Sequence, residues 1–154
     1  MTEPTIRQLL SYRLHVVASL LSRGAEMRYR RECGVSLWEW RTVALLGGAK
    51  GALSLNDLAR AAGIDKSQMS RVVAGLTKRK VVSRQTDKKD ARGIRLTLTA
   101  SGRKLYERLI DAASERNDAF LECLTREERR SLEGILTKLG HEARQFIQKE
   151  KEAA

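Results

Sequence analysis

Apolar residues recur at helical spacing along the first part of the chain. Between residues 6 and 29 they return every three or four positions, and further apolar residues widen the stripe to two sides. The residues that recur at this spacing are Ile6, Leu10, Leu14, Val17 and Leu21. The pattern predicts one long helix that buries two sides and is broken by Gly34.

Capping residues predict three shorter helices after it. Ser36 and Glu39 have the spacing of a capping box, which predicts a helix ended by the glycine-rich segment 47–51. Ser54 caps a short helix that Gly63 closes with a sharp turn. Asp65 is suited to cap the next helix, whose inward residues at helical spacing are Met69, Val72, Val73 and Leu76.

Two β-branched segments then predict an antiparallel hairpin. They span 81–86 and 94–98 and flank the polar stretch 87–93. Short helix, glycine turn, second helix and hairpin is the order of a winged helix-turn-helix, in which the second helix enters the DNA major groove. We therefore expect a mostly α protein with a small antiparallel β-hairpin wing.

The last part of the chain is helical again. Thr99 caps one helix, and Thr125 with Glu128 forms a capping box for the last one. The last helix has strict four-three spacing of its apolar residues, which indicates a narrow seam for a partner helix. That seam consists of Leu132, Leu136, Leu139, Ala143 and Phe146.

The distribution of charge along the chain suggests a binding partner. Residues 66–95 hold ten Lys or Arg and two Asp, so +8 of the formal net charge of +11 lies in one fifth of the 154 residues. A basic block on a helix and a hairpin favours nucleic acid. Because the chain has no N-terminal leader pattern and no run of about 18 apolar residues, we expect a cytoplasmic protein that does not span a membrane.

The helix that begins after Asp65 has an outward face without carboxylates. Its outward line lies opposite the inward residues at 100° per residue. That line is Ser67, Arg71, Ala74 and Lys78, flanked by Gln68 and Ser70. A face that lacks acidic partners loses the ion pairs of a solvated helix, which favours DNA phosphates as the source of negative charge.

Side-chain chemistry suggests a role for each residue of this face. Gln68 can bond an adenine edge, Arg71 can bond guanine or a phosphate, and Ala74 can meet a thymine methyl group. Alternatively, Gln68 completes a capping box with Asp65 and stays within its own helix.

The remaining polar residues of this region suit the DNA backbone. Ser67 and Ser70 fit phosphates. The lysines and arginines at the helix ends are expected to position the DNA backbone, although such cations also simply complement a helix dipole. They are Lys66, Lys78, Arg79 and Lys80.

The hairpin tip carries the candidate minor-groove contacts. Arg92 is assigned to a narrow, A/T-rich minor groove, and Lys88 and Lys89 lie on the same ribbon. Asp90 is assigned a structural role in the wing. Alternatively, Asp90 and Arg92 pair with each other and only hold the shape of the tip.

The motif order resembles the MarR family of bacterial transcriptional regulators. The resemblance rests on Leu58-Ala59 and on DKSQMSRVVAGL at 65–76, VVSR at 81–84, DKKDAR at 87–92 and LTLTASG at 96–102. It implies a homodimer and one winged lobe per subunit. The 154-residue chain would then be a single domain with its winged helix-turn-helix lobe at 34–99 and a helical dimerisation region at 1–33 and 100–154.

The resemblance also assigns residues and a function. By position it assigns recognition-helix contacts to Ser67, Gln68, Ser70 and Arg71, the structural acid of the wing to Asp90, and the minor-groove arginine to Arg92. It implies a repressor that binds a (pseudo)palindromic operator and is released by a small phenolic or aromatic-acid effector.

One departure from the family pattern bears on geometry. Lys80 stands where a glycine commonly ends the recognition helix. Because a residue with a side chain resists positive φ, either the helix ends differently here or Lys80 is strained.

An effector pocket can be suggested from residue types. Aromatic walls with a nearby cation fit an acidic aromatic ligand, and the candidates are Tyr12, His15, Trp38 and Arg41. The alternative is that these residues only pack in the core.

Other functional classes fit less well. The chain has two histidines, no glycine-rich phosphate cradle and no metal-ligand cluster, which disfavours an enzyme, a metal site or a cofactor. Oxidant sensing by Cys33 is a minor hypothesis, based on arginines that would favour a thiolate. The stronger rivals are an architectural protein that binds DNA or RNA regardless of sequence, and an adaptor that uses only the helical seam.

Overall fold

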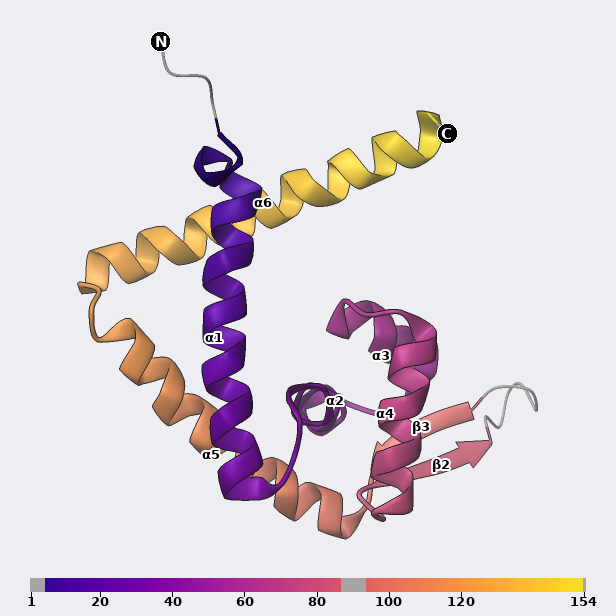
Figure 1. The fold of residues 1–154 in the computed structure, drawn as a ribbon. Helices are drawn as coiled ribbons and strands as arrows, with labels where there is room; N and C mark the ends of the chain where they lie inside the picture. The colour runs from indigo at the N-terminus through magenta and orange to yellow at the C-terminus, as the bar shows by residue number, and fades with distance from the viewer. Residues whose placement is uncertain (1–4, 87–93, 154) are drawn as a thin grey trace. The chain divides into compact units, whose positions relative to one another are not determined.

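The computed structural model describes residues 5–86 and 94–153, and it is mostly helical (Figure 1). The helices and strands follow the predicted order. They are a 3-10 helix η1 (Ile6–Gln8), α1 (Leu10–Cys33), α2 (Leu37–Gly48), β1 (Leu53–Ser54), α3 (Leu55–Ala62), α4 (Lys66–Lys78), β2 (Val82–Thr86), β3 (Ile94–Leu98), α5 (Ala100–Leu121) and α6 (Arg126–Ala153).

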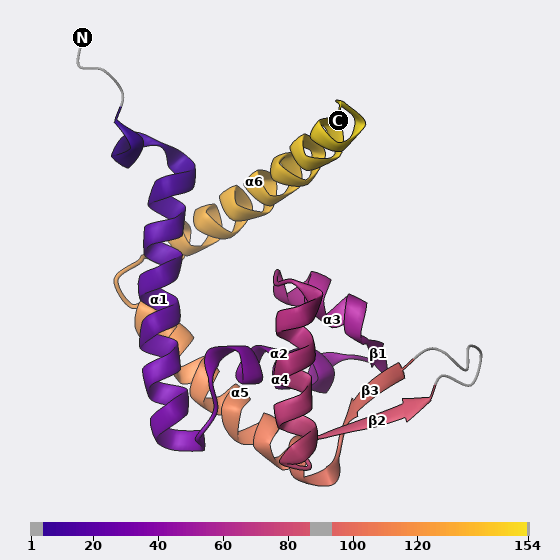
Figure 2. The same ribbon diagram turned by 45° about the vertical axis from the view of Figure 1, so that its right-hand side comes forward.

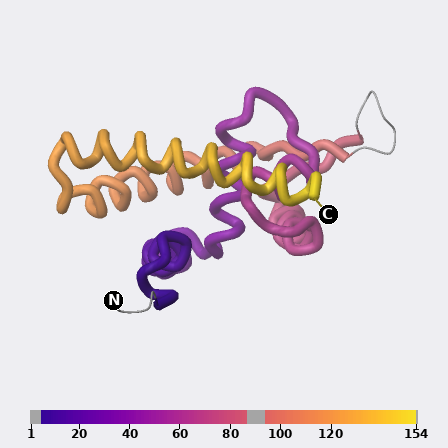
Figure 3. The backbone as a smooth tube through the Cα atoms, turned by 90° about the horizontal axis from the view of Figure 1, so that it is seen from above, coloured from indigo at the N-terminus to yellow at the C-terminus, as the bar shows by residue number. Residues whose placement is uncertain are grey.

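The chain divides into two compact units, Met1–Ser114 and Glu115–Ala154. The first holds η1 to β3 and most of α5. The second holds the end of α5 and all of α6, which is a single continuous helix (Figure 3).

The hydrophobic core of the first unit is formed by residues of α2, α3, α4, α5 and the strands, and Figure 2 shows how these elements are arranged. Leu58, Met69, Leu76 and Leu96 are fully buried there. The end of α1 joins this core through Tyr29, whose ring stacks at a tilt on Trp40 with centroids 5.2 Å apart. The core therefore anchors the inward faces of α3 and α4.

The wing is part of a three-stranded antiparallel sheet with strand order β1-β3-β2. The predicted hairpin pairs Val82 with Leu98 and Thr86 with Ile94. The two-residue strand β1 is an addition, in which Leu53 pairs with Leu96. A strand of two residues has no alternating pattern, so the sequence gives no signal for it.

Helix α2 is longer than predicted, because it includes the first two residues of the glycine-rich segment. Gly47 lies against the ring of Tyr106, and an added Cβ would fall 2.6 Å from its Cγ. The glycine thus serves close packing between α2 and α5 rather than ending the helix.

Lys80 follows α4 in the left-handed region, with φ of 58°. The bonds of a Schellman motif surround it: Val81 N–H donates to the Leu76 carbonyl at 2.9 Å, and Lys80 N–H donates to the Thr77 carbonyl at 2.9 Å. Of the two outcomes that the sequence leaves open, the structure therefore has the usual helix end with a strained lysine in the glycine position.

The long first helix has little burial within this chain. Only Ala25 and Tyr29 are buried on α1, and no residue described on α6 is buried. Large apolar side chains are instead exposed on both helices. On α1 these include Leu10, Leu14, Val17 and Leu20, and on α6 they include Leu132, Ile135, Leu136, Phe146 and Ile147. The two buried sides predicted for the first helix are thus open to solvent in a single chain.

Candidate nucleic-acid interface

Helix α3 is capped tightly at its start. Ser54 Oγ accepts a hydrogen bond from Asp57 N–H at 3.1 Å and donates one to the Asp57 carboxylate at 2.7 Å. This hydroxyl lowers the pKa of Asp57, so the carboxylate stays ionised at the positive end of the helix. Gly63 closes α3 with φ of 70°, which turns the chain sharply into α4.

The two faces of α4 are those predicted from the periodicity. Met69, Val73 and Leu76 are fully buried. The outward line, consisting of Ser67, Arg71, Ala74 and Lys78, is exposed. In residues 5–86 and 94–153, no carboxylate forms a salt bridge with Arg71 or Lys78. The exposed line of α4 is therefore free of acidic partners in the described structure.

The start of α4 bears on the two interpretations of Gln68. Asp65 accepts a hydrogen bond from Gln68 N–H at 2.8 Å, so the N-cap predicted for Asp65 is present. The return bond from the Gln68 side chain, which a capping box requires, is not formed between these two described residues. The half-buried Gln68 amide is thus left available beside the outward line, with Ser70 on the other flank.

The candidate backbone contacts differ in their surroundings. Lys66 and Lys78 are exposed at the two ends of α4. Arg79, which follows Lys78, is exposed too, but its guanidinium donates to the carboxylate of Glu39 on α2 at 2.9 Å. Sequence reasoning missed this partner of Arg79, because the two residues lie 40 positions apart.

The wing is described only at its strands. The candidates Lys88, Lys89, Asp90 and Arg92 lie outside the described residues. Near the start of β3, Arg95 Nη1 donates to the Ala52 carbonyl at 3.3 Å, which ties β3 to the segment before β1.

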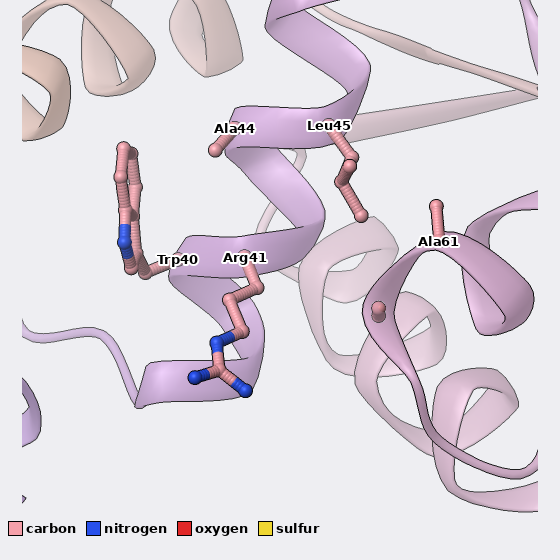
Figure 4. A pocket seen from close by; sticks show the side chains of 6 residues that line it. Trp40, Arg41, Ala44, Leu45 and Ala61 are labelled. Atoms are coloured by element: carbon pink, nitrogen blue, oxygen red, sulfur yellow. The ribbon is translucent and has the colours of Figure 1, made fainter. Parts of the chain in front are cut away.

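A cavity of about 290 Å³ opens between α2 and α3 (Figure 4). Its lining consists of Trp40, Arg41, Ala44, Leu45, Ala61 and Ala62. Small alanines beside a tryptophan leave room for a planar group, and Arg41 adds a positive charge. The sequence signal that could have indicated Trp40 is its i, i+4 spacing from Ala44.

Of the four candidate effector residues, Arg41 lines this cavity. Its guanidinium lies 4.8 Å from the centroid of the Trp38 ring and donates to Ser22 Oγ on α1 at 3.3 Å. Tyr12 and His15 are exposed on α1 and are not among the lining residues.

The arginines near Cys33 form ion pairs with glutamates. Arg28 and Arg31 pair with Glu32, and Arg30 pairs with Glu26. Cys33 itself is half-buried and packs against the core. The cations on which the oxidant-sensing hypothesis depends therefore already have carboxylate partners.

The structure describes residues 5–86 and 94–153 of the chain. No helix there combines the length and apolar character that crossing a bilayer requires. No group of three or more His, Cys, Asp or Glu side chains in that part of the chain is placed to hold a metal ion.

Comparison with known proteins identifies the family. The model of the MarR family matches residues 34–93, the segment from the start of α2 to the wing. The HTH-type transcriptional regulator FarR of Neisseria gonorrhoeae is 36% identical over 101 residues, which are 66% of this chain and 68% of that protein. This chain belongs to the MarR family.

Solved structures of MarR proteins extend the similarity to nearly the whole chain. A MarR/EmrR family transcriptional regulator from Acinetobacter sp. ADP1 matches with a TM-score of 0.84 and 27% identity, over 92% of this chain and 99% of that one. NadR, solved in complex with 4-hydroxyphenylacetate, matches with a TM-score of 0.75 and 29% identity, over 90% and 97%. The winged helix-turn-helix predicted from the sequence is confirmed, and its MarR relatives are transcriptional regulators.

Proposed function

We propose that this protein is a homodimeric MarR regulator that reads a (pseudo)palindromic operator with α4 and is released by an aromatic acid. The observation that carries the proposal is the division of α4 into two faces. One face is locked in the core by Met69, Val73 and Leu76, and the other presents Arg71 and Lys78, for which the described part of the chain holds no acidic partner. A helix so divided fits a major groove lined by phosphates.

The exposed apolar residues of α1 and α6 support the homodimer. Leu10, Leu14 and Val17 on α1 are 54%, 40% and 54% exposed, and Phe146 on α6 is 63% exposed. Helices with such faces bury them against a partner, and the four-three seam of α6 suits a second copy. A two-fold dimer would hold two α4 helices about 34 Å apart, one turn of DNA.

Selection of bound duplexes from a random pool tests this function. A regulator of this type should enrich a palindrome whose half-sites are centred roughly 10 base pairs apart. Enrichment of no sequence, with binding that depends on salt alone, would instead favour the architectural protein. Absence of any duplex binding at moderate salt would favour the adaptor.

Gln68→Ala should relax the choice of sequence. If the amide reads an adenine edge, its loss should cost about 1–3 kcal/mol of discrimination at one position of each half-site. Affinity for random duplex should change little, and competition binding with single-base variants of the selected site measures both.

Lys78→Ala is the matched control for a phosphate contact. It should weaken binding to every duplex alike and lower the slope of log K against log salt by about 0.9 for each phosphate lost. Equal effects of Gln68→Ala and Lys78→Ala on all sequences would contradict a reading role for Gln68.

The proposed effector site is the cavity between α2 and α3. Its tryptophan and alanines form an apolar wall, and Arg41 can pair with a carboxylate. NadR, the relative that binds 4-hydroxyphenylacetate, makes an aromatic acid the first class to test. Tyr12, His15 and Trp38 remain proposed contributors that do not line the cavity described here.

Arg41→Gln should uncouple release from DNA binding. We expect 4-hydroxyphenylacetate to weaken operator binding by the wild-type protein about tenfold, within the usual range of such couplings. The Arg41→Gln protein should bind the operator but respond much less. Arg23→Gln, an exposed position on α1, is the control and should respond normally. A normal response of Arg41→Gln in titrations of labelled duplex would exclude this cavity as the effector site.

A further inference from the structure

The carboxylate of Glu39 joins the start of α2 to the end of α4. One oxygen accepts a hydrogen bond from Ser36 N–H at 2.8 Å, which completes the capping box of α2. The other accepts from Arg79 at 2.9 Å. The Glu39 side chain is only 20% exposed, so this bond is partly shielded from water and salt.

A second contact holds the same end of α4. The carbonyl of Lys80 accepts hydrogen bonds from the hydroxyls of Thr99 and Ser101, at 2.7 and 2.8 Å, at the start of α5. The left-handed conformation of Lys80 accompanies these contacts. The C-terminal end of α4 is thus fixed from two directions, by α2 and by α5.

The charged hydrogen bond between Arg79 and Glu39 constrains the orientation of α4 more closely than the apolar contacts of its buried face do. Apolar contacts of Met69, Val73 and Leu76 determine which side faces the core, but they are not directional. A guanidinium–carboxylate bond has a preferred geometry and therefore resists a small tilt or rotation of the helix. Over the roughly 18 Å from Arg79 to Ser67, at 1.5 Å per residue, a tilt of about 10° would move the reading end by about 3 Å.

We propose that Glu39 and Arg79 are positioning residues for DNA recognition. Glu39 binds Arg79 and sets the orientation in which α4 presents Gln68 and Arg71. Arg79 then serves the arrangement of the helices rather than a phosphate. This inference rests on the proposed function, in which α4 reads a duplex.

Glu39→Gln separates the two bonds of Glu39. Glutamine can still accept from Ser36 N–H and so keeps the capping box, whereas the charge that pairs with Arg79 is lost. Ser36→Ala is the matched control, because it removes the hydroxyl cap and leaves the ion pair. We expect Ser36→Ala to lower the melting temperature without changing operator affinity at a temperature where it is folded.

The duplex selected by the wild-type protein serves as the probe. We expect Glu39→Gln and Arg79→Gln each to weaken its binding about tenfold, and the double variant to bind no more weakly than either single one. The slope of log K against log salt should be the same in the wild-type protein, the two single variants and the double variant, because no phosphate contact is removed.

Several outcomes would overturn the inference. If Arg79 contacts a phosphate, Glu39→Gln should release it and strengthen binding, and Arg79→Gln should lower the salt slope by about 0.9 per contact. Unchanged affinity in both single variants, or additive losses in the double variant, would equally contradict it. Failure of the wild-type protein to select any duplex would instead reject the proposed function itself.

Discussion

Gly102→Ala is expected to destabilise this protein by about 3 kcal/mol, the upper end of the usual cost of overpacking, although alanine normally favours a helix over glycine. Gly102 lies in the first turn of α5, where an added Cβ would clash with the backbone oxygen of Val81. It would also fall 3.3 Å from Cβ of Leu98. The oxygen of Val81 has little freedom to move, since it accepts from Thr99 N–H at 3.0 Å.

The clash occurs where the wing and α5 meet the core. Val81 is buried, and Leu98 packs against the same core at the end of β3. Relief of the clash would have to separate α5 from the segment that joins α4 to β2. Urea denaturation at fixed protein concentration measures the loss, which is a substantial fraction of the roughly 5–15 kcal/mol by which a domain is usually stable.

Gly75→Ala is the matched control. Gly75 lies inside α4, and an added Cβ would meet no atom within 4 Å from the described residues beyond its chain neighbours and the backbone of its own helix. The same substitution should therefore raise stability by roughly 0.5–1 kcal/mol, because alanine is the better helix former. Similar effects at both positions would show that close packing does not explain Gly102.

The elements that could be predicted are those set by neighbouring residues. The capping residues Ser36, Ser54 and Asp65 each form the expected hydrogen bond. Apolar periodicity correctly separates the buried and exposed faces of α4. Both signals act within four residues along the chain, so tertiary structure does not need to be known.

What could not be predicted depends on contacts between distant residues. The ion pair of Glu39 with Arg79, the packing of Gly47 on Tyr106 and the strand β1 all join segments far apart in the sequence. The cavity likewise depends on residues that lie far apart in the sequence. The chemistry of Arg41 makes it a candidate from the sequence, but the alanines that make room beside it come from both α2 and α3.

Arg71→Glu should abolish specific binding, with a loss of at least 100-fold in affinity for the selected duplex. The substitution removes the proposed contact of Arg71 with a base edge, a kind of contact worth about 1–3 kcal/mol, and places a negative charge on the acid-free face of α4. Repulsion between like charges at an interface costs several kcal/mol more. A dimer makes the same change in both half-sites.

Arg23→Glu separates a local effect from one of overall charge. Arg23 is exposed on α1, away from α4 in the sequence, and its substitution changes the net charge by the same amount. If Arg71 acts only through long-range attraction between the protein and DNA, Arg71→Glu and Arg23→Glu should lose equal affinity. In that case 150 mM salt should reduce both losses. Contact of Arg71 with the duplex instead predicts that only Arg71→Glu loses the selected site, at low and at physiological salt alike. Equal losses of affinity in fluorescence anisotropy titrations would contradict contact between α4 and the duplex.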